Sequence, residues 1–235
     1  MFSVAILPAV APCATVDVQT IIQKSVEANE ADFKAAPDYS YRKRERDDQG
    51  SKTYQVLMID GSPYQKLLAV NDKPLSKEQS AKEQRQQRIA KFEKDRHRDH
   101  AMMEQLTKAF EFKLLGQGKL RSFNVYTLRA TPRPGYKPPS METQVLSGMR
   151  GELWIDSATY QWVKVTAKVI HPVSIEGFLA QVEPGTQFEL EKMPVGDGVW
   201  MPKHFAMKSH AKILHLFNHF NQENDTFSDY HKNGP

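Results

Sequence analysis

The sequence predicts a mainly β protein of the α+β class, with an antiparallel sheet and helices packed on it. In residues 151–165, GELWIDSATYQWVKV, apolar side chains alternate on either side of the turn sequence Asp-Ser-Ala-Thr, which is typical of a β-hairpin. Alternating segments of this kind recur through most of the 235 residues. Helical spacing of apolar residues is confined to residues 16–34 and to about 76–112.

The N-terminal residues resemble the end of a secretory signal peptide. Phe2 to Val10 form an apolar stretch that is too short to span a bilayer, and small residues follow it. No Lys or Arg precedes this stretch. We interpret residues 1–14 as the remnant of an export signal, and the alternatives are a lipidated Cys13 or a cytosolic protein. Cys13 is the only cysteine, which excludes an internal disulfide.

Residues 16–34 are predicted to form an amphipathic helix that ends before Pro37. A three-stranded meander is predicted over residues 39–70. Within it, Tyr54, Val56 and Met58 share one face of a strand and Leu57 and Ile59 the other, so the strand is expected to be covered on both sides.

Residues 76–112 are predicted to form one bent helix or two helices inserted between strands. Ser76 and Gln79 fit a capping box, and neither Gly nor Pro interrupts the residues that follow. The first half is mostly charged. The second half carries the apolar stripe Met103, Leu106 and Phe110, which we expect to lie on the sheet as a cover.

From residue 112 the chain returns to strands, including FLAQV, TQFELEKM and the single long strand HFAMKSHAKILHLFNHF at 204–220. Four prolines and a glycine make TPRPGYKPPS, residues 131–140, an extended loop. Asp197-Gly198 predicts a tight turn. Because no linker divides the chain, residues 15–235 are predicted to form one domain.

Composition and motifs favour a binding protein over an enzyme. The formal net charge of +4 and pI of about 9.0 are too mild and unclustered for a nucleic-acid partner, while attraction to anionic lipid headgroups and a peripheral membrane contact remain open. No Ser lies in a Gly-x-Ser-x-Gly elbow, and Gly116-Gln117-Gly118 predicts a turn rather than a phosphate loop. The sequence therefore predicts no catalytic residue and no cofactor.

Two histidine patterns carry the spacing of metal ligands. Glu93, His97, His100 and Glu104 share one side of a helix, but Arg96 and Arg98 repel cations, so we predict a solvated ridge without a metal. His215 and His219 have helical ligand spacing as well. The alternation around them favours a strand that presents them to a cavity or to the surface. Trp154, Trp162 and Trp200 are predicted to lie in the core, with lining of an apolar cavity as the alternative.

Several segments together resemble a known superfamily of exported bacterial proteins. They are TYQVLMIDGSPYQKLLAVNDKPLS, ATPRPGYKPPS, RGELWIDSATYQWVKV and DGVWMPKHF. Over residues 38–232 they resemble an uncharacterised exported family that is similar to the lipoprotein-sorting carriers LolA and LolB. The resemblance implies a half-open antiparallel β-barrel, a strongly curved sheet with helices covering its concave face, and an acyl chain held there.

The resemblance implies a non-enzymatic, periplasmic or otherwise exported protein that binds a lipid or a lipoprotein acyl chain, with a role in lipid or lipoprotein transport. An envelope partner protein would fit such a role. The alternatives are an envelope scaffold with a filled interior and an envelope hydrolase with a histidine–carboxylate site. The predicted cavity lining consists of Val56, Met58, Leu68, Val163, Val165, Phe188, Leu190 and Phe217.

Overall fold

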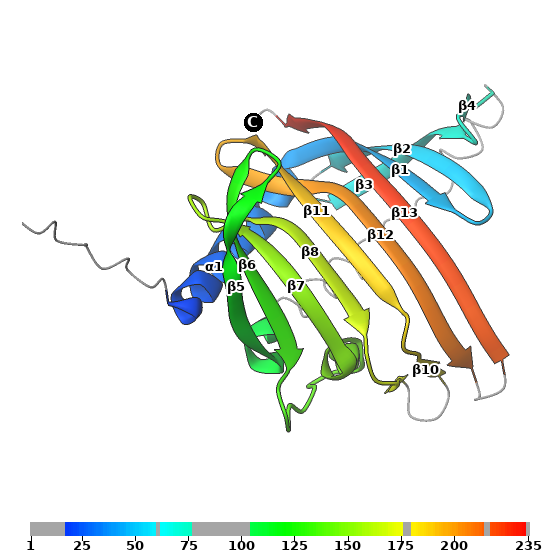
Figure 1. The fold of residues 1–235 in the computed structure, drawn as a ribbon. Helices are drawn as coiled ribbons and strands as arrows, with labels where there is room; N and C mark the ends of the chain where they lie inside the picture. The colour runs from blue at the N-terminus through cyan, green and yellow to red at the C-terminus, as the bar shows by residue number, and fades with distance from the viewer. Residues whose placement is uncertain (1–16, 60–61, 77–103, 176–179, 214–216, 234–235) are drawn as a thin grey trace, which may run out of the picture.

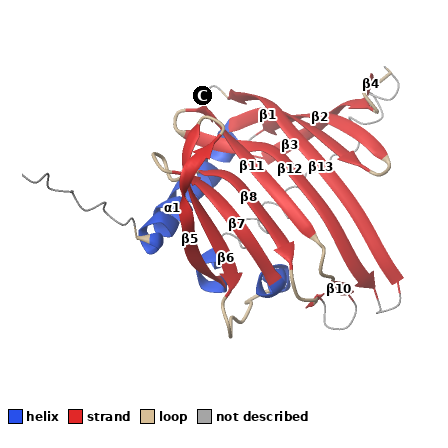
Figure 2. Ribbon diagram, viewed as in Figure 1, coloured by secondary structure: helices blue, strands red, loops and turns tan. Residues whose placement is uncertain are grey.

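The computed structural model describes residues 17–59, 62–76, 104–175, 180–213 and 217–233. One 13-stranded sheet dominates these residues (Figures 1 and 2). Its strands are β1 (Tyr39–Asp47), β2 (Gly50–Ile59), β3 (Ser62–Val70), β4 (Lys73–Pro74), β5 (Phe110–Leu120), β6 (Phe123–Pro132), β7 (Met149–Asp156), β8 (Trp162–Val169), β9 (Val173–Ile175), β10 (Ala180–Val182), β11 (Gln187–Gly196), β12 (Val199–Ile213) and β13 (Phe217–Lys232).

The sheet is antiparallel, strongly curved and open. Its strands follow the order β4-β3-β2-β1-β13-β12-β11-β8-β7-β6-β5; in addition, β10 pairs with β12, and β9 pairs with β10. Figure 1 shows that the two ends of this order bend back to the same side, which makes that side concave. The mainly β fold class predicted from the sequence, with its curved and half-open sheet, is confirmed.

Helix α1 (Val18–Ala35) lies across the concave side behind β5–β8 (Figure 2). The carboxylate of Asp17 caps it by accepting hydrogen bonds from the backbone N–H groups of Gln19 and Thr20. Its apolar stripe includes the buried side chains of Ile21 and Ile22, which face the sheet. The predicted helix at 16–34 is thus confirmed to within two residues at each end.

Polar groups hold the second half of α1 to β11, to β12 and to Gln161, the residue before β8. Asp32 forms a buried ion pair with Lys192, with the ammonium Nζ 2.5 Å from the carboxylate Oδ2. The other carboxylate oxygen accepts hydrogen bonds from the backbone N–H of Trp200 at 2.9 Å and from the side chain of Gln161 at 3.1 Å. Burial lowers the pKa of Lys192, and the charge of Asp32 opposes that shift.

Two hydrophobic clusters pack on opposite faces of the sheet. The inner face, defined as the face that α1 covers, carries the larger cluster, which includes Leu128, Leu153 and Ile155. The outer face carries a smaller cluster of Val125, Val163 and Trp200, with Phe123 and Trp154 against it. The tryptophans at 154 and 200 therefore pack on the outer face. Trp162 packs against the inner cluster and donates its indole N–H to Ser25 of α1 at 2.6 Å.

The two hairpins predicted most directly from sequence are present. Strands β7 and β8 pair as the hairpin of residues 151–165 requires, and the Asp156 carboxylate closes the turn by accepting from the backbone N–H and hydroxyl of Thr159. Between β11 and β12, Asp197 and Gly198 both have positive φ, which is the backbone of a two-residue hairpin turn.

Some predicted boundaries are wrong. Phe110 begins strand β5 and pairs with Pro132, so the helical insertion ends at residue 109 rather than near 112. The predicted strand over 204–220 is two strands, because β12 ends at Ile213 and its backbone pairs with Phe217 at the start of β13.

The loop at 131–140 begins later than predicted, since β6 continues to Pro132. Ser140 then caps the short helix α4 (Met141–Gln144), which leads into the 3-10 turn Val145–Gly148.

Several predictions concern residues outside the described ranges. These are the export signal at 1–14, most of the insertion at 77–103 with Met103, Glu93, His97 and His100, and His215. Within the ranges that the structure does describe, no helix is long and apolar enough to cross a membrane. No group of three His, Cys, Asp or Glu side chains in those same ranges is arranged to hold a metal ion.

Candidate ligand-binding face

Apolar side chains form two continuous rows across the inner face, from β6 to β12. The cross-strand register builds the first row from Leu128, Leu153, Val165, Leu190 and Phe205. The second row, one pleat along the strands, consists of Ala130, Gly151, Ala167, Phe188 and Met207. Four strand spacings of about 4.8 Å give each row a width of about 19 Å.

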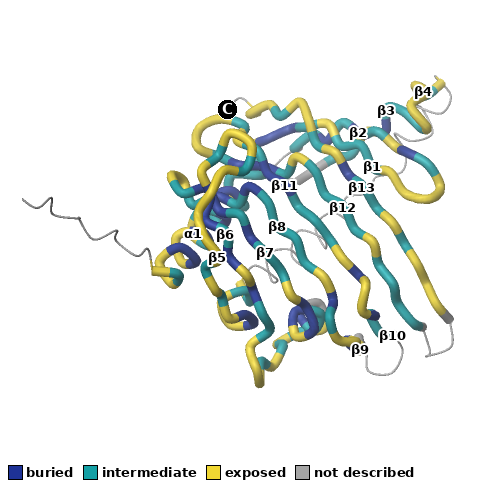
Figure 3. Tube along the Cα trace, in the orientation of Figure 1, coloured by how far each residue is buried: buried dark blue, intermediate teal, exposed yellow. Residues whose placement is uncertain are grey.

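Burial falls along these rows with distance from α1 (Figure 3). Leu128 and Leu153 are fully packed in the inner cluster. On β8 and β11, Val165, Ala167 and Phe188 are half-buried against the edge of that cluster. Leu190 and the β12 members Phe205 and Met207 are also half-buried, but they belong to neither hydrophobic cluster of the described residues. The inner face therefore presents apolar side chains beyond the core that α1 completes.

Three of the predicted lining residues meet on this face. Val165 pairs directly with Leu190, and Phe188 lies one pleat away on β11. The sequence prediction did not include Phe205 and Met207. Residues 204–213, HFAMKSHAKI, alternate as a strand does, but Phe217 is the only residue of 204–220 that the sequence analysis places in the lining. Gly151 and Ala167 are too small to indicate a cavity lining in the sequence, and only the cross-strand register places them in the second row.

Val56 and Met58 lie on the same inner face but at its other end. They are on β2, which is separated from β11 by β1, β13 and β12. Val56 is fully buried opposite Tyr41. Leu68 falls at a β-bulge, so its neighbour Leu67 pairs with Tyr54 of β2 and is the buried residue of the two.

Val163 and Phe217 are not brought into the rows. A bulge between Trp154 and Ile155 turns Val163 to the outer face, where it packs in the cluster with Val125 and Trp200. Phe217 starts β13 opposite Ile213. From the predicted cover, Leu106 lies in the described helical residues 104–109 and packs against the inner cluster, while Phe110 is buried in that cluster as a strand residue.

A charged strip, defined as Lys43, Glu45, Glu223 and Asp225, separates the two apolar regions. The first apolar row continues from Phe205 to Asp225 and then to Glu45, and the second continues from Met207 to Glu223. The Lys43 ammonium lies 2.8 Å from Asp225 and 2.9 Å from Glu45. Each apolar row therefore ends at an acidic side chain on β13.

Burial shifts the pKa values of the side chains in the charged strip. Asp225 is only 2% exposed, and its Oδ1 atom has no hydrogen-bond partner among the residues that the structure describes. Burial raises the pKa of Asp225, although the charge of Lys43 opposes the shift. Burial and the neighbouring charge of Asp225 also raise the pKa of Glu223. For Lys43, the attraction of Asp225 and Glu45 outweighs burial, so its pKa is raised.

We expect Glu223→Gln to raise the free energy of unfolding at neutral pH by about 0.5 kcal/mol, because Glu223 and Asp225 lie two residues apart on one face of β13 and their negative charges repel each other. The raised pKa values mean that the native protein binds protons before the unfolded chain does. Wild-type stability therefore gains from this site as the pH falls from neutral toward the ordinary carboxyl range near 4, and loses that gain as the pH rises.

Urea denaturation between neutral pH and pH 4 measures the difference between wild type and variant. The difference should shrink as the pH falls. Glu111→Gln, at an exposed position on β5, should leave the wild-type profile unchanged. An equal stability difference at every pH would show that Glu223 carries no shifted titration.

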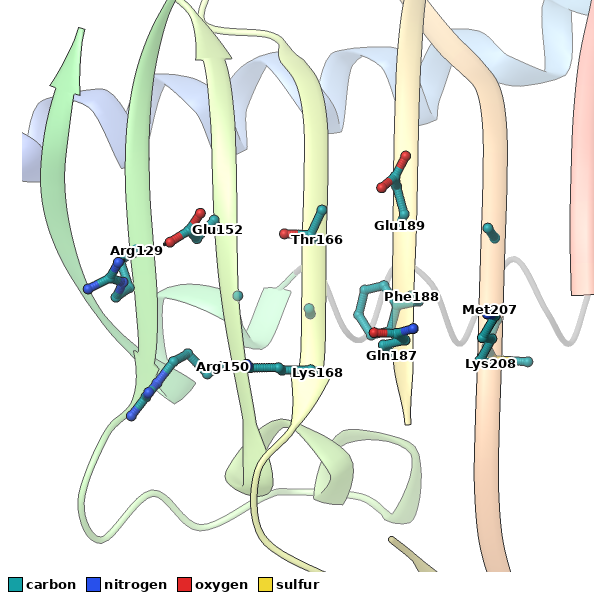
Figure 4. A pocket seen from close by; sticks show the side chains of 13 residues that line it. Arg129, Arg150, Glu152, Thr166, Lys168, Gln187, Phe188, Glu189, Met207 and Lys208 are labelled. Atoms are coloured by element: carbon teal, nitrogen blue, oxygen red, sulfur yellow. Dashed lines mark hydrogen bonds and ion pairs between the residues drawn. The ribbon is translucent and has the colours of Figure 1, made fainter. Parts of the chain in front are cut away.

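The outer face holds a shallow trough of about 710 Å³ over β6, β7, β8, β11 and β12 (Figure 4). Its charged lining residues are Arg129, Arg150, Glu152, Lys168, Glu189 and Lys208. Both acids are neutralised: Arg129 contacts Glu152 at 3.1 Å, and Lys164 contacts Glu189 at 2.8 Å. Gly151, Ala167, Phe188 and Met207 of the second inner row also contribute to the lining of the trough. Its charged side chains carry a net positive charge, because four cations stand against two acids.

Comparisons with known proteins point to distant structural likenesses. No protein-family model matches the sequence, and no curated protein matches it. A domain assigned to an outer membrane lipoprotein-sorting protein of Vibrio parahaemolyticus has 13% identity and a TM-score of 0.34, with 89% of this chain and 92% of that chain covered. A LolA superfamily protein of Nitrosomonas europaea has 12% identity and a TM-score of 0.37, with 94% and 95% covered.

The complex of MucA and MucB from Pseudomonas aeruginosa provides a third match, at 9% identity and a TM-score of 0.28, which covers 90% of this chain and 99% of that chain.

Proposed function

We propose that this protein binds the acyl chain of a lipid or lipoprotein on the inner face of its curved sheet, as a carrier or binding protein of the cell envelope rather than as an enzyme. The observation that supports this most is the continuation of two apolar rows onto β11 and β12, beyond the core that α1 completes. Leu190, Phe205 and Met207 remain half-buried there and outside both clusters.

Elementary energetics favour such a ligand. Each methylene group that leaves water contributes about 0.8 kcal/mol, so a long acyl chain supplies roughly 10 kcal/mol before the cost of ordering it. Gly151 has no side chain and Ala167 has only a methyl group, so the middle of the second row projects little from the sheet. Acidic side chains at the β13 end of both rows favour a ligand whose apolar part stops before that strand, because a buried charge beside a methylene chain is costly.

A fluorescent fatty-acid probe tests the proposal. We expect the delipidated protein to bind the probe at micromolar concentration or better, and Leu190→Asn to weaken this binding about tenfold, since it places an amide in the middle of the first row. Leu106→Glu should speed probe release, because Leu106 packs the helical residues 104–109 against the inner cluster.

Leu115→Asn is the matched control, because Leu115 is an exposed leucine of β5, 41% accessible, outside both rows. It should leave probe binding unchanged. An unchanged affinity in Leu190→Asn, or a wild-type protein that binds no amphiphile after delipidation, would contradict the proposal. The second outcome would favour a scaffold whose interior is filled by its own side chains.

A further inference from the structure

The outer-face trough contains a row of cations that no acid of the described residues neutralises. Arg150 on β7 pairs directly with Lys168 on β8, Lys168 pairs with Gln187 on β11, and Gln187 pairs with Lys208 on β12. We call Arg150, Lys168 and Lys208 the cationic row. All three side chains are exposed, and no ion pair joins any of them to another residue in the described part of the chain.

This arrangement is unfavourable for the isolated protein. Like charges directly opposite each other on adjacent strands destabilise a sheet, and Arg150 and Lys168 are such a pair. The acids nearest to the row do not relieve the repulsion, because Glu152 is held by Arg129 and Glu189 by Lys164. The row spans three strand spacings, about 14 Å, and offers its charge to an anionic partner.

An exposed aromatic ring lies beside the cationic row on the same face. Phe220 on β13 is 66% exposed and stacks on His210 of β12, with ring centroids 4.3 Å apart. His210 follows Lys208 at the next outward-facing position of β12. A soluble anion makes no use of an exposed phenyl ring, whereas a membrane surface accepts aromatic rings at the headgroup level and cations beside them.

We propose that the outer face of β7, β8, β11 and β12 docks onto a membrane surface rich in anionic phospholipid, with the cationic row contacting the headgroups and Phe220 entering the interface. This face is opposite the one proposed to hold the acyl chain. Docking would therefore leave the inner face uncovered by the bilayer, and the two proposals succeed or fail separately.

Co-sedimentation with vesicles tests the docking. The full chain should bind vesicles of phosphatidylcholine and phosphatidylglycerol, should not bind vesicles of phosphatidylcholine alone, and should dissociate as salt is raised. In the triple variant Arg150→Gln, Lys168→Gln, Lys208→Gln, partitioning should fall about 100-fold, at about 1 kcal/mol for each cation near an anionic surface. Phe220→Ser should weaken partitioning less.

The matched control is Lys34→Gln, Lys113→Gln, Lys119→Gln, which removes the same charge from exposed positions on α1 and β5. It should retain most of the binding. The thermal midpoint of the row variant should equal or slightly exceed that of wild type, because the variant relieves repulsion. A midpoint at or above that of wild type would exclude unfolding as the cause of the lost binding.

Three outcomes would overturn the proposal. The first is an equal loss in both triple variants, which would show attraction to net charge alone. The second is failure of the wild type to bind anionic vesicles while it binds polyglutamate, which would assign the row to an acidic polypeptide. The third is displacement by inorganic phosphate beyond that by chloride at equal ionic strength, which would indicate a site for free phosphate.

Discussion

Asp32→Ala is expected to lower the free energy of unfolding by about 3–5 kcal/mol, because it leaves the Lys192 ammonium buried without its counter-ion. The side chains of Asp32 and Lys192 are 6% and 8% exposed. The same substitution removes the acceptor of the Trp200 backbone N–H and of the Gln161 amide. An unpaired buried donor adds to the cost of the unpaired charge.

Two further variants separate charge from packing. Asp32→Ala combined with Lys192→Met removes both charges, so it should be less destabilising than Asp32→Ala alone. Asp32→Asn keeps an acceptor for Trp200 but not the charge, and should fall between wild type and Asp32→Ala. Urea denaturation gives all three values. If Asp32→Ala costs less than about 1 kcal/mol, the pair does not secure α1 to the sheet.

Leu128→Ala is expected to lower the free energy of unfolding by about 3 kcal/mol, whereas Leu190→Ala in the same row should cost about 1 kcal/mol. Leu128 is fully buried in the cluster that α1 completes. Leu190 is half-buried and lies outside both clusters, so its truncation removes less contact and leaves no closed cavity.

The comparison of the two leucines measures how far the core extends along the row. Leu190→Ala should weaken binding of the fatty-acid probe despite its small effect on stability. A cost at Leu190 equal to that at Leu128 would show that the inner face is as tightly filled at β11 as at β6. That result would favour the scaffold over the binding protein.

Local chemistry determined much of what the structure shows. Alternation and a polar turn predict the β7–β8 hairpin, since strand geometry sends successive side chains to opposite faces. Asp197-Gly198 predicts the β11–β12 turn, because both residues accept positive φ. Apolar residues at helical spacing predict α1. In each case the interactions that decide the element lie within a few residues along the chain.

Register within the sheet decided the composition of the candidate site. Alternation alone did not reveal the bulges that turn Val163 outward and set Leu67, rather than Leu68, opposite Tyr54, because one added residue exchanges the two faces of a strand. Likewise, apolar and polar residues alternate throughout residues 204–220, although the chain reverses direction between Ile213 and Phe217. Both strands of a hairpin alternate in the same way, so alternation does not reveal the turn between them.

By itself, the sequence determined the class of fold, the hairpins and the amphipathic helix, because these follow from backbone preferences and short-range periodicity. Only the tertiary structure decided which faces meet. The Asp32–Lys192 pair joins residues 160 positions apart, and the charged strip brings β1 against β13. Such contacts depend on the order in which distant strands pair, and no local pattern encodes that order because each alternating strand can pair with many others.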